Sequence, residues 1–425
     1  MSKFCVVILA AGEGKRMKSR LPKVMHPVCG VPMINHVVAA ARAVKPARVT
    51  VVIGGARKEV RGVLEKGVGV AVQNVPQGTA DAVRCAVKDI PAAAKDVVIL
   101  YGDTPLIRKE TVEALYAHHR DNRAACTVLT THVANPRGYG RILRDPSGQV
   151  IGIIEDKEAT QVQRAIREVN TGMYVFAKDD LLEGLGHVHP APKTGEYYLT
   201  DVLGWLFQKG RKVEACVAED SEEVAGVNSQ MDLLAATHAL CRRVLERHLE
   251  AGVGIMDAHT VFIDPSATIG EGTTVYPFTY IEAGVVIGRH CSVGPFCHLR
   301  TGAVLEDDVS VGNYTEIKNS RLGKGTFMRH VSYLGDTSVG KGVNIGAGTV
   351  VANFDGRKKN RTAIGDKAFI GCDAVLIAPV TVGKNAVVGA GAVVPRGHNV
   401  ADRSVVAGVP ARPLRQTGKQ TRTAS

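Results

Sequence analysis

The chain has 425 residues and a formal net charge of +12 at pH 7. A basic chain favours anionic partners, but its lysines and arginines are spread out and form no stripe interleaved with aromatic residues. This pattern argues against nucleic acid and favours small phosphorylated ligands. No apolar run approaches the length that crosses a membrane, so membrane insertion is not expected.

The cysteine pattern and the N-terminal residues indicate in which cellular compartment the protein is found. Nine cysteines are scattered without a Cys-x-x-Cys pair, and their number is odd. This indicates reduced thiols and not a disulfide framework. The chain opens on a strand-like segment with no charged-then-apolar leader before it. We therefore expect a cytoplasmic protein.

The first strand leads into a loop of small residues. Phe4 to Leu9 is an apolar, β-branched run suited to a buried strand, and residues 10–17 follow as Ala-Ala-Gly-Glu-Gly-Lys-Arg-Met. Small residues let backbone N–H groups approach a phosphate, and nearby lysines and arginines supply cations. The third glycine of a dinucleotide fingerprint is missing, so a nucleotide site and a plain strand-to-helix turn are equally open at this point.

Strands and helices then alternate, which predicts a mostly parallel sheet. Strands are expected at residues 49–53, 70–73, 97–101 and 126–133, and helices at 32–44, 59–64, 79–87 and 109–118. Ligands of such sheets lie at the carboxyl ends of strands, where Gln73, Asp103 and Glu155 stand. A carboxylate beside a phosphate loop suits Mg²⁺, although Asp103 could also simply form the turn before Pro105.

Residues 229–251 form one amphipathic helix, with Ser229 as its N-cap and Gly252 as its stop. We interpret it as a connector between two domains. Residues 412–425 carry too little apolar surface to fold, and we expect a disordered tail.

A six-residue repeat dominates the second half of the chain. Neither a helix nor a half-buried strand has this period, whereas a parallel β-helix places one inward aliphatic residue on each side of each coil. Glycine often follows the aliphatic residue, and we expect it where a corner needs unusual backbone angles. The strongly basic interruption at residues 353–362 is predicted to be a functional loop. The repeating aliphatic residues are Ile263, Ile269, Val275, Ile281, Ile287, Val293, Leu299, Leu305, Val311, Ile317, Leu322, Met328, Leu334, Val339, Ile345, Val351, Ile364, Ile370, Leu376, Val382, Val388 and Val394.

Together these motifs resemble the bacterial bifunctional N-acetylglucosamine-1-phosphate uridyltransferase / glucosamine-1-phosphate acetyltransferase family over nearly the whole chain. The motifs are Leu9-Ala-Ala-Gly-Glu-Gly-Lys-Arg-Met, Leu21-Pro-Lys-Val, Gln77-Gly-Thr-Ala, Tyr101-Gly-Asp-Thr-Pro-Leu, Gly138-Tyr-Gly-Arg-Ile, Glu168-Val-Asn-Thr-Gly, Glu196-Tyr-Tyr-Leu-Thr-Asp, Gly226-Val-Asn, Gly294-Pro-Phe-Cys-His-Leu-Arg, His330-Val-Ser-Tyr-Leu-Gly-Asp and Val343-Asn-Ile-Gly-Ala-Gly-Thr. The resemblance implies a Rossmann-like α/β nucleotidylyltransferase domain (1–228), a linker helix (229–252) and a left-handed parallel β-helix of hexapeptide repeats (253–411), before the tail (412–425).

In the first domain the resemblance implies a site for UTP, Mg²⁺ and N-acetylglucosamine 1-phosphate. The nucleotide-binding residues would be Ala10, Gly12, Arg16, Lys23, Gln73, Gly78 and Thr79. The metal ligands would be Asp103 and Asn228. The sugar-binding residues would be Gly140, Glu155, Asn170 and Asn228. Two departures adjoin this site, since Lys15 stands where the family usually has Thr and Asp81 where it often has His.

In the β-helix the resemblance implies acetyl transfer from acetyl-CoA to glucosamine 1-phosphate, with His330 as the base. The sugar-phosphate binders would be Arg300, Lys318, Tyr333, Asn344 and Lys359. The acetyl-CoA cleft would be lined by Ala347, Asn353, Phe354, Cys372 and Ala390. The family is homotrimeric with clefts between neighbouring β-helices, so a homotrimer is expected here.

The sequence-based interpretation is therefore a bifunctional enzyme that makes UDP-N-acetylglucosamine. Two alternatives stay open. One is a monofunctional sugar-1-phosphate nucleotidylyltransferase whose β-helix serves oligomerisation or regulation. The other is a non-catalytic assembly protein. The basic residues grouped with His330 speak against the first, and retained Lys23, Asp103 and Asn228 speak against the second.

Overall fold

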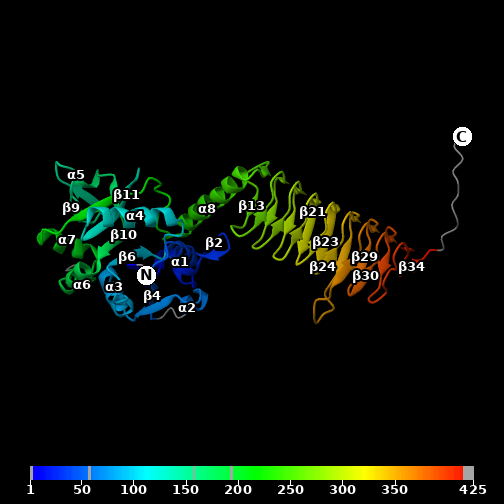
Figure 1. Cartoon of the computed structure of the whole chain (residues 1–425), viewed down its shortest axis with the longest axis horizontal. Helices are drawn as coiled ribbons and strands as arrows, with labels where there is room; N and C mark the ends of the chain where they lie inside the picture. Colours follow the sequence, from blue (N-terminus) through cyan, green and yellow to red (C-terminus); the bar gives the residue numbers. More distant parts are fainter. Residues whose placement is uncertain (1–2, 56–58, 157, 192–194, 415–425) are drawn as a thin grey trace. The chain divides into compact units, whose positions relative to one another are not determined.

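The computed structural model describes residues 3–55, 59–156, 158–191 and 195–414 (Figure 1). The chain divides into two compact units, residues 1–240 and 241–425. Within the described ranges, no helix is long and apolar enough to cross a membrane.

A mostly parallel sheet forms the centre of the first unit, in the order β11-β7-β10-β6-β1-β4-β5. Strand β1 pairs in parallel with β4 and β6, whereas β10 is antiparallel to β6 and β7. The strands are β1 (Phe4–Ala10), β4 (Val49–Gly54), β5 (Gly69–Gln73), β6 (Asp96–Tyr101), β7 (Cys126–His132), β10 (Glu168–Ala177) and β11 (Val213–Val217). The expected strands are confirmed to within one residue at each end.

Helices cover both faces of this sheet. One layer comprises α1 (Met33–Ala43) and α4 (Lys109–Asn122), and the other comprises α3 (Thr79–Ala86), α6 (Lys178–Gly186) and α7 (Thr200–Gln208). Every residue of β1 is buried, as its apolar run predicted. Helix α4 is longer than expected: it continues to Asn122, and Arg123, whose backbone is left-handed (φ 49°), caps its end. Two short helices are α2 (Glu59–Val63) and α5 (Gln161–Arg164).

The strand that precedes Glu155 is not one of the parallel strands of the sheet. Strands β8 (Arg141–Arg144) and β9 (Val150–Ile154) form an antiparallel hairpin, and β8 also pairs with β10. Its turn is fixed locally, since the Asp145 carboxylate accepts bonds from the backbone N–H of Ser147 and Gln149 at 2.9 Å each. Glu155 thus follows a strand of a hairpin and not a strand of the parallel sheet. A second small hairpin joins β2 (Pro27–Val28) and β3 (Val31–Pro32).

The connector helix is α8 (Gln230–Glu250), and the boundary between the two units falls within it, after Leu240. The Ser229 hydroxyl accepts a bond from the N–H of Asp232 (3.3 Å), and the Asp232 carboxylate accepts one from the N–H of Ser229 (2.8 Å). This reciprocal capping confirms Ser229 as the N-cap. Gly252 follows with φ 82°, as expected for a residue that stops a helix.

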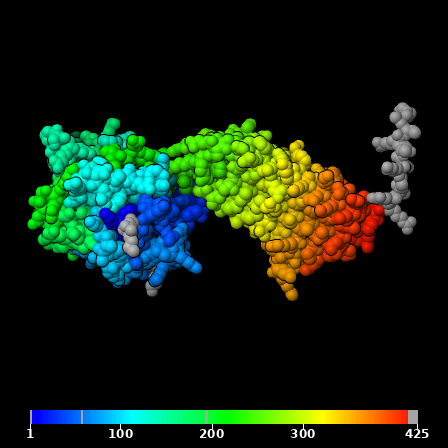
Figure 2. Space-filling model, in the orientation of Figure 1, coloured from blue at the N-terminus to red at the C-terminus, as the bar shows by residue number. Residues whose placement is uncertain are grey.

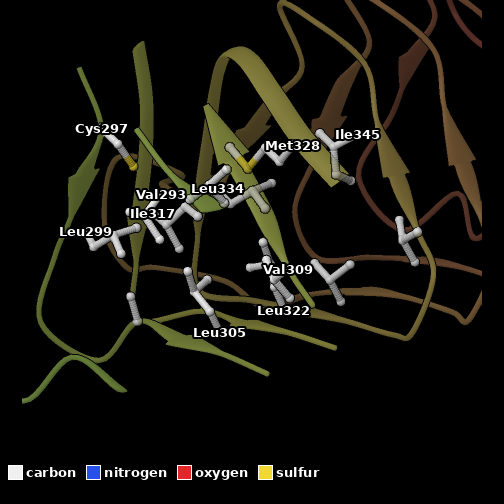
Figure 3. Packing of buried hydrophobic residues seen from close by; sticks show 14 of the residues in the cluster. Val293, Cys297, Leu299, Leu305, Val309, Ile317, Leu322, Met328, Leu334 and Ile345 are labelled. Carbon is white, nitrogen blue, oxygen red and sulfur yellow. The ribbon is translucent and has the colours of Figure 1, made fainter. Parts of the chain in front are cut away.

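The second unit is a parallel β-helix with a continuous aliphatic core (Figure 3). All of the repeating aliphatic residues are buried, which confirms the six-residue period. One face comprises β14 (Thr268–Ile269), β17 (Val286–Ile287), β20 (Val304–Leu305), β22 (Arg321–Leu322), β24 (Thr337–Val339), β27 (Thr362–Ile364) and β30 (Val380–Val382).

The other two faces are joined into one sheet where β21 (Ser310–Lys318) and β23 (Phe327–Gly335) run through a corner without a break. The remaining strands are β12 (Gly254–Ile255), β13 (Phe262–Ile263), β15 (Thr274–Val275), β16 (Tyr280–Ile281), β18 (Ser292–Val293), β19 (His298–Leu299), β25 (Asn344–Ile345), β26 (Val350–Ala352), β28 (Phe369–Ile370), β29 (Val375–Ile377), β31 (Val387–Val388), β32 (Val393–Val394) and β33 (Val405–Ala407).

The glycines that follow core aliphatics have two roles, and only one of them was expected. Gly294 has a positive φ (99°), but Gly288, Gly346 and Gly371 do not. A Cβ on Gly346 would lie 2.6 Å from the backbone nitrogen of Cys372 in the next coil. Gly288, Gly346 and Gly371 are glycines because successive coils approach closely there, whereas Gly294 adopts the expected unusual backbone angle.

The basic interruption is a projecting loop. It leaves the β-helix after β26, is closed by a bridge between Phe354 and Lys359, and rejoins at β27. It appears as the orange protrusion on the second unit (Figure 2). At the chain's end, β34 (Arg412–Pro413) pairs with β33, so the expected tail is ordered at its start. The expectation of disorder for 415–425 lies outside the described residues.

Candidate functional site

A cavity of about 470 Å³ opens at the carboxyl ends of β1, β5 and β6. It brings together most residues expected to bind the nucleotide: Ala10, Gly12, Lys23, Gln73, Gly78, Thr79 and Asp103. Arg16 does not line it. It lines a neighbouring cavity of about 360 Å³ together with Asp103 and Asn228. The two cavities share Tyr101 and Asp103, so the predicted nucleotide and metal residues lie in one region.

Two glycines shape the larger cavity. A Cβ on Gly12 would meet no described atom within 4 Å, so the backbone here faces open space that a phosphate could approach. Gly78 has φ 107°, and a Cβ there would lie 2.5 Å from the carbonyl oxygen of Tyr197. The Thr79 hydroxyl accepts a bond from the N–H of Leu199 (2.9 Å), so Thr79 also holds the segment that follows Tyr197 against the start of α3.

Asp103 and Asn228 converge on one cation, the ammonium of Lys23. Lys23 forms an ion pair with the Asp103 carboxylate and donates to Oδ1 of Asn228 at 3.1 Å. These two oxygens therefore already face a common positive charge, and carboxylate and amide oxygens suit Mg²⁺. In the described part of the chain, no group of three or more His, Cys, Asp or Glu side chains forms a metal cage. A metal here would need substrate phosphates or water to complete its ligands.

Three of the four residues expected to bind the amino sugar, Gly140, Glu155 and Asn170, lie together beside the hairpin β8–β9, whereas the fourth, Asn228, contacts Lys23. The Asn170 N–H donates to the Gly140 carbonyl (2.8 Å), and a Cβ on Gly140 would lie 3.5 Å from Oε1 of Glu155. Asn170 Nδ2 donates to the Tyr174 hydroxyl (2.8 Å). Burial, followed by repulsion from Glu158 and Asp201, raises the pKa of Glu155. Because Gly140 has no side chain, a sugar can approach the half-buried Glu155 carboxyl, which can bind sugar hydroxyls.

The structure adds residues that the sequence reasoning did not assign. Tyr101 lines both cavities, and burial raises its pKa above the ordinary range. Glu196 lines the larger cavity, and Tyr139 and Asp232 line the smaller one. Tyr101, Tyr139 and Glu196 stand within motifs that carried the resemblance, so their motif positions were the available signal. Lys15 lines the cavity and pairs with Glu13 at 2.8 Å.

In the second unit, the three expected cations gather where neighbouring coils stack. Lys359 and Arg300, both close to Lys318, lower the pKa of Lys318 by charge repulsion. Arg300 is balanced by Glu316 (2.7 Å) and Glu282 (3.6 Å). Cations brought together in this way are suited to bind an anion.

Tyr333 lies beside this cation group, and His330 does not contact it. Tyr333 pairs in register with Glu316, the partner of Arg300. His330 lies on the same strand, opposite Asn313, and its side chain is exposed. Within the described residues no hydrogen bond or ion pair joins the His330 imidazole to Arg300, Lys318 or Lys359. One chain therefore brings these cations together and leaves the His330 side chain exposed.

The residues expected to line the coenzyme cleft fall into two groups. Ala347, Cys372 and Ala390 occupy one corner of successive coils, because the N–H of Asp373 donates to Ala347 and that of Gly391 to Cys372 (2.7 Å each). Asn353 and Phe354 begin the projecting loop. Asn353 is buried and donates to Asp336 (2.6 Å), whereas Phe354 is 59% exposed. Asn344 pairs with Phe327 and Phe369.

Comparisons with known proteins cover both units. Residues 6–189 match the MobA-like NTP transferase domain, and residues 266–301 and 361–396 match the bacterial transferase hexapeptide (six repeats) family. A protein of Heliobacterium modesticaldum described as "Bifunctional protein GlmU" is 42% identical and covers 95% of this chain and 96% of its own. Proteins of the same description from Streptomyces avermitilis and Caldicellulosiruptor saccharolyticus are 41% and 39% identical, and each covers 92% of this chain.

Proposed function

The chain belongs to the family of bifunctional GlmU proteins, and from that premise we propose how its two units divide the synthesis of UDP-N-acetylglucosamine. The enzyme carries out two reactions. Acetyl-CoA acetylates glucosamine 1-phosphate, and the N-acetylglucosamine 1-phosphate that results takes uridylyl from UTP with release of pyrophosphate. We assign uridylyl transfer to residues 1–228 and acetyl transfer to the left-handed β-helix (253–411), with residues 229–252 as the link.

In the uridylyltransferase site, the sugar phosphate attacks the α-phosphate of UTP, so two anions must be brought together. Gln73, Gly78 and Thr79 would hold the uridine, with Ala10 and Gly12 beneath the phosphates. Arg16 and Lys23 would neutralise charge, while Gly140, Glu155 and Asn170 would bind the sugar. Asp103 and Asn228 would hold Mg²⁺, which when bound supplies positive charge to the phosphates. The convergence of these oxygens on one cation supports this choice.

In the acetyltransferase site, the amine of glucosamine 1-phosphate attacks the thioester carbonyl, His330 takes the amine proton, and the C–S bond breaks to release the coenzyme A thiol. An ordinary imidazole titrates at about pH 6.5, which suits a base near neutrality. Arg300, Lys318, Tyr333, Asn344 and Lys359 would bind the sugar phosphate. Ala347, Asn353, Phe354, Cys372 and Ala390 would border the coenzyme. The observation that carries this second activity is the grouping of Arg300 and Tyr333 around Glu316 on neighbouring coils, with Lys318 and Lys359 close by, which a purely structural β-helix would not need.

We also propose that the enzyme is a homotrimer located in the cytoplasm. His330 is exposed on one chain, so a neighbouring chain is needed to enclose its reaction. Phe278, Phe296 and Tyr314 stack on successive corners with ring centroids 4.8 and 5.1 Å apart, and their side chains are exposed. Apolar surface of this kind is commonly buried in association. The scattered cysteines, none of them in a Cys-x-x-Cys pair, support the cytoplasmic location.

Two substitutions test the separation of the sites. His330→Ala should reduce release of the CoA thiol by roughly a hundredfold or more and leave pyrophosphate release unchanged. Asp103→Asn should do the converse. Both activities would be measured on each purified variant with its own substrates. Loss of both activities in a variant that still folds would contradict independent sites.

A further inference from the structure

Asp81 contacts the residue expected to recognise the nucleotide base. Gln73 is the last residue of β5 and is 3% exposed, and Asp81 lies in the first turn of α3. The amide nitrogen of Gln73 donates to Oδ2 of Asp81 at 2.7 Å and to the Gly78 carbonyl at 3.1 Å. Both amide N–H groups are therefore occupied by protein oxygens.

These two contacts fix which end of the Gln73 amide faces the cavity. A carboxylate and a backbone carbonyl only accept hydrogen bonds, so the amide nitrogen must point toward them and the oxygen Oε1 away. Among the described residues no hydrogen bond to Oε1 is found. Because Gln73 lines the 470 Å³ cavity, the group it can offer a ligand is an acceptor.

An oriented acceptor distinguishes the two pyrimidines. Ring nitrogen N3 of uracil carries a hydrogen and donates, whereas N3 of cytosine is an acceptor. The inference requires N3 of the base to face Oε1, because there uracil forms a hydrogen bond and cytosine places two acceptors together. A freely rotating amide would turn its nitrogen to cytosine, but here that turn would break the bonds to Asp81 and Gly78.

We propose that Asp81 is a specificity-determining positioning residue, which selects uracil over cytosine by holding the Gln73 amide in one orientation. This inference rests on the proposed assignment of Gln73 to the base. Asp81 acts through Gln73, and it need not touch the nucleotide. The Gly78 carbonyl assists, but Asp81 supplies the shorter and charged contact, which is the stronger kind.

The test compares UTP with CTP in Asp81→Leu and Asp81→Asn. Steady-state pyrophosphate release would be measured with N-acetylglucosamine 1-phosphate and each nucleotide. Leu removes the acceptor, so KM for UTP should rise about tenfold at nearly constant kcat, and the ratio of kcat/KM for UTP over CTP should fall about tenfold. Asn keeps an accepting oxygen and should retain most of the ratio. Asp121→Leu, at an exposed aspartate of α4, is the matched control and should behave as wild type.

The outcomes separate this inference from the proposed function. Equal losses for UTP and CTP in Asp81→Leu would show a merely structural role and overturn the inference. An unchanged ratio, or an Asn variant that loses as much discrimination as the Leu variant, would overturn it as well. Failure of the wild-type enzyme to use UTP at all would instead contradict the assignment of uridylyl transfer.

Discussion

Glu155 illustrates, at the scale of one residue, how binding and stability can oppose each other. Its carboxyl lies beside Gly140 and Asn170, and burial raises its pKa. Between the ordinary glutamate pKa and this raised pKa, the folded protein therefore holds a proton that the unfolded chain releases. The contribution of Glu155 to stability is greatest below the ordinary glutamate pKa and is lost as pH rises through the raised, folded value.

Glu155→Gln is accordingly expected to stabilise the first unit and impair its chemistry. At pH 7.5 an amide avoids the cost of burying a carboxylate, so the Tm of the first unit should rise relative to wild type, and the gain should shrink toward pH 4. KM for N-acetylglucosamine 1-phosphate should increase about tenfold or more if the carboxylate binds the sugar. Differential scanning calorimetry at the two pH values and initial rates would check both effects. The exposed Glu219→Gln is the control, and an unchanged Tm and KM for Glu155→Gln would contradict the assignment.

Among the structural elements, the repeating strands of the β-helix could be predicted from the sequence, whereas features that depend on contacts between distant residues could not. The six-residue period identified the β-helix because every coil requires the same inward aliphatic residue. The basic interruption was recognised for the converse reason, since residues 353–362 lack the period. The hairpin β8–β9 was missed because its short apolar strands resemble parallel ones, and the role of Gly346 was missed because the next coil lies far away in sequence.

Most candidate residues came from the resemblance and not from spacing. Acids and amides after strand ends could be placed near a cavity from the sequence, and the structure gathers Gln73, Gly78 and Asp103 there. The contact between Asp81 and Gln73 could not be predicted, because it depends on where α3 starts relative to β5. The cation group at Lys318 likewise requires the register of the coils.

The projecting loop provides one prediction. Lys359→Ala should raise KM for glucosamine 1-phosphate by roughly ten- to a hundredfold, the scale of one charged hydrogen bond, with little change in KM for acetyl-CoA. The matched control is Lys358→Ala in the same loop, whose N–H contact to Asp355 is kept because it comes from the backbone. Initial rates of CoA release measure both constants. Equal effects of the two variants would show that the loop acts only through its overall positive charge and not through a specific contact of Lys359.

The start of α8 provides another prediction. Asp232 accepts bonds from the N–H groups of Asn228 (2.9 Å) and Ser229, so the helix cap also positions a candidate metal ligand. Asp232→Ala should cost about 0.5–2 kcal/mol of stability and raise the Mg²⁺ concentration needed for half-maximal uridylyl transfer. Thermal unfolding and a Mg²⁺ titration would check this. Glu246→Ala, on the exposed side of the same helix, should leave the titration unchanged, and a normal titration for Asp232→Ala would remove Asn228 from the metal site.

At the scale of the whole molecule, assembly should matter to one activity and not to the other. If acetyl transfer needs more than one chain, light scattering should give a mass three times the 45.1 kDa of the chain. Specific acetyl-transfer activity should fall on dilution through the range where the trimer dissociates, while specific uridylyl-transfer activity stays constant. A fully active monomer would contradict the shared cleft.

The central claim is that two independent sites act in sequence, acetyl transfer first and uridylyl transfer second. The most direct measurement incubates the wild-type enzyme with glucosamine 1-phosphate, UTP and Mg²⁺, with and without acetyl-CoA, and identifies the products by mass over time. We expect N-acetylglucosamine 1-phosphate to form first and UDP-N-acetylglucosamine to follow, and hardly any UTP to be consumed without acetyl-CoA. Formation of UDP-glucosamine without acetyl-CoA, or no acetylated product with it, would contradict the account.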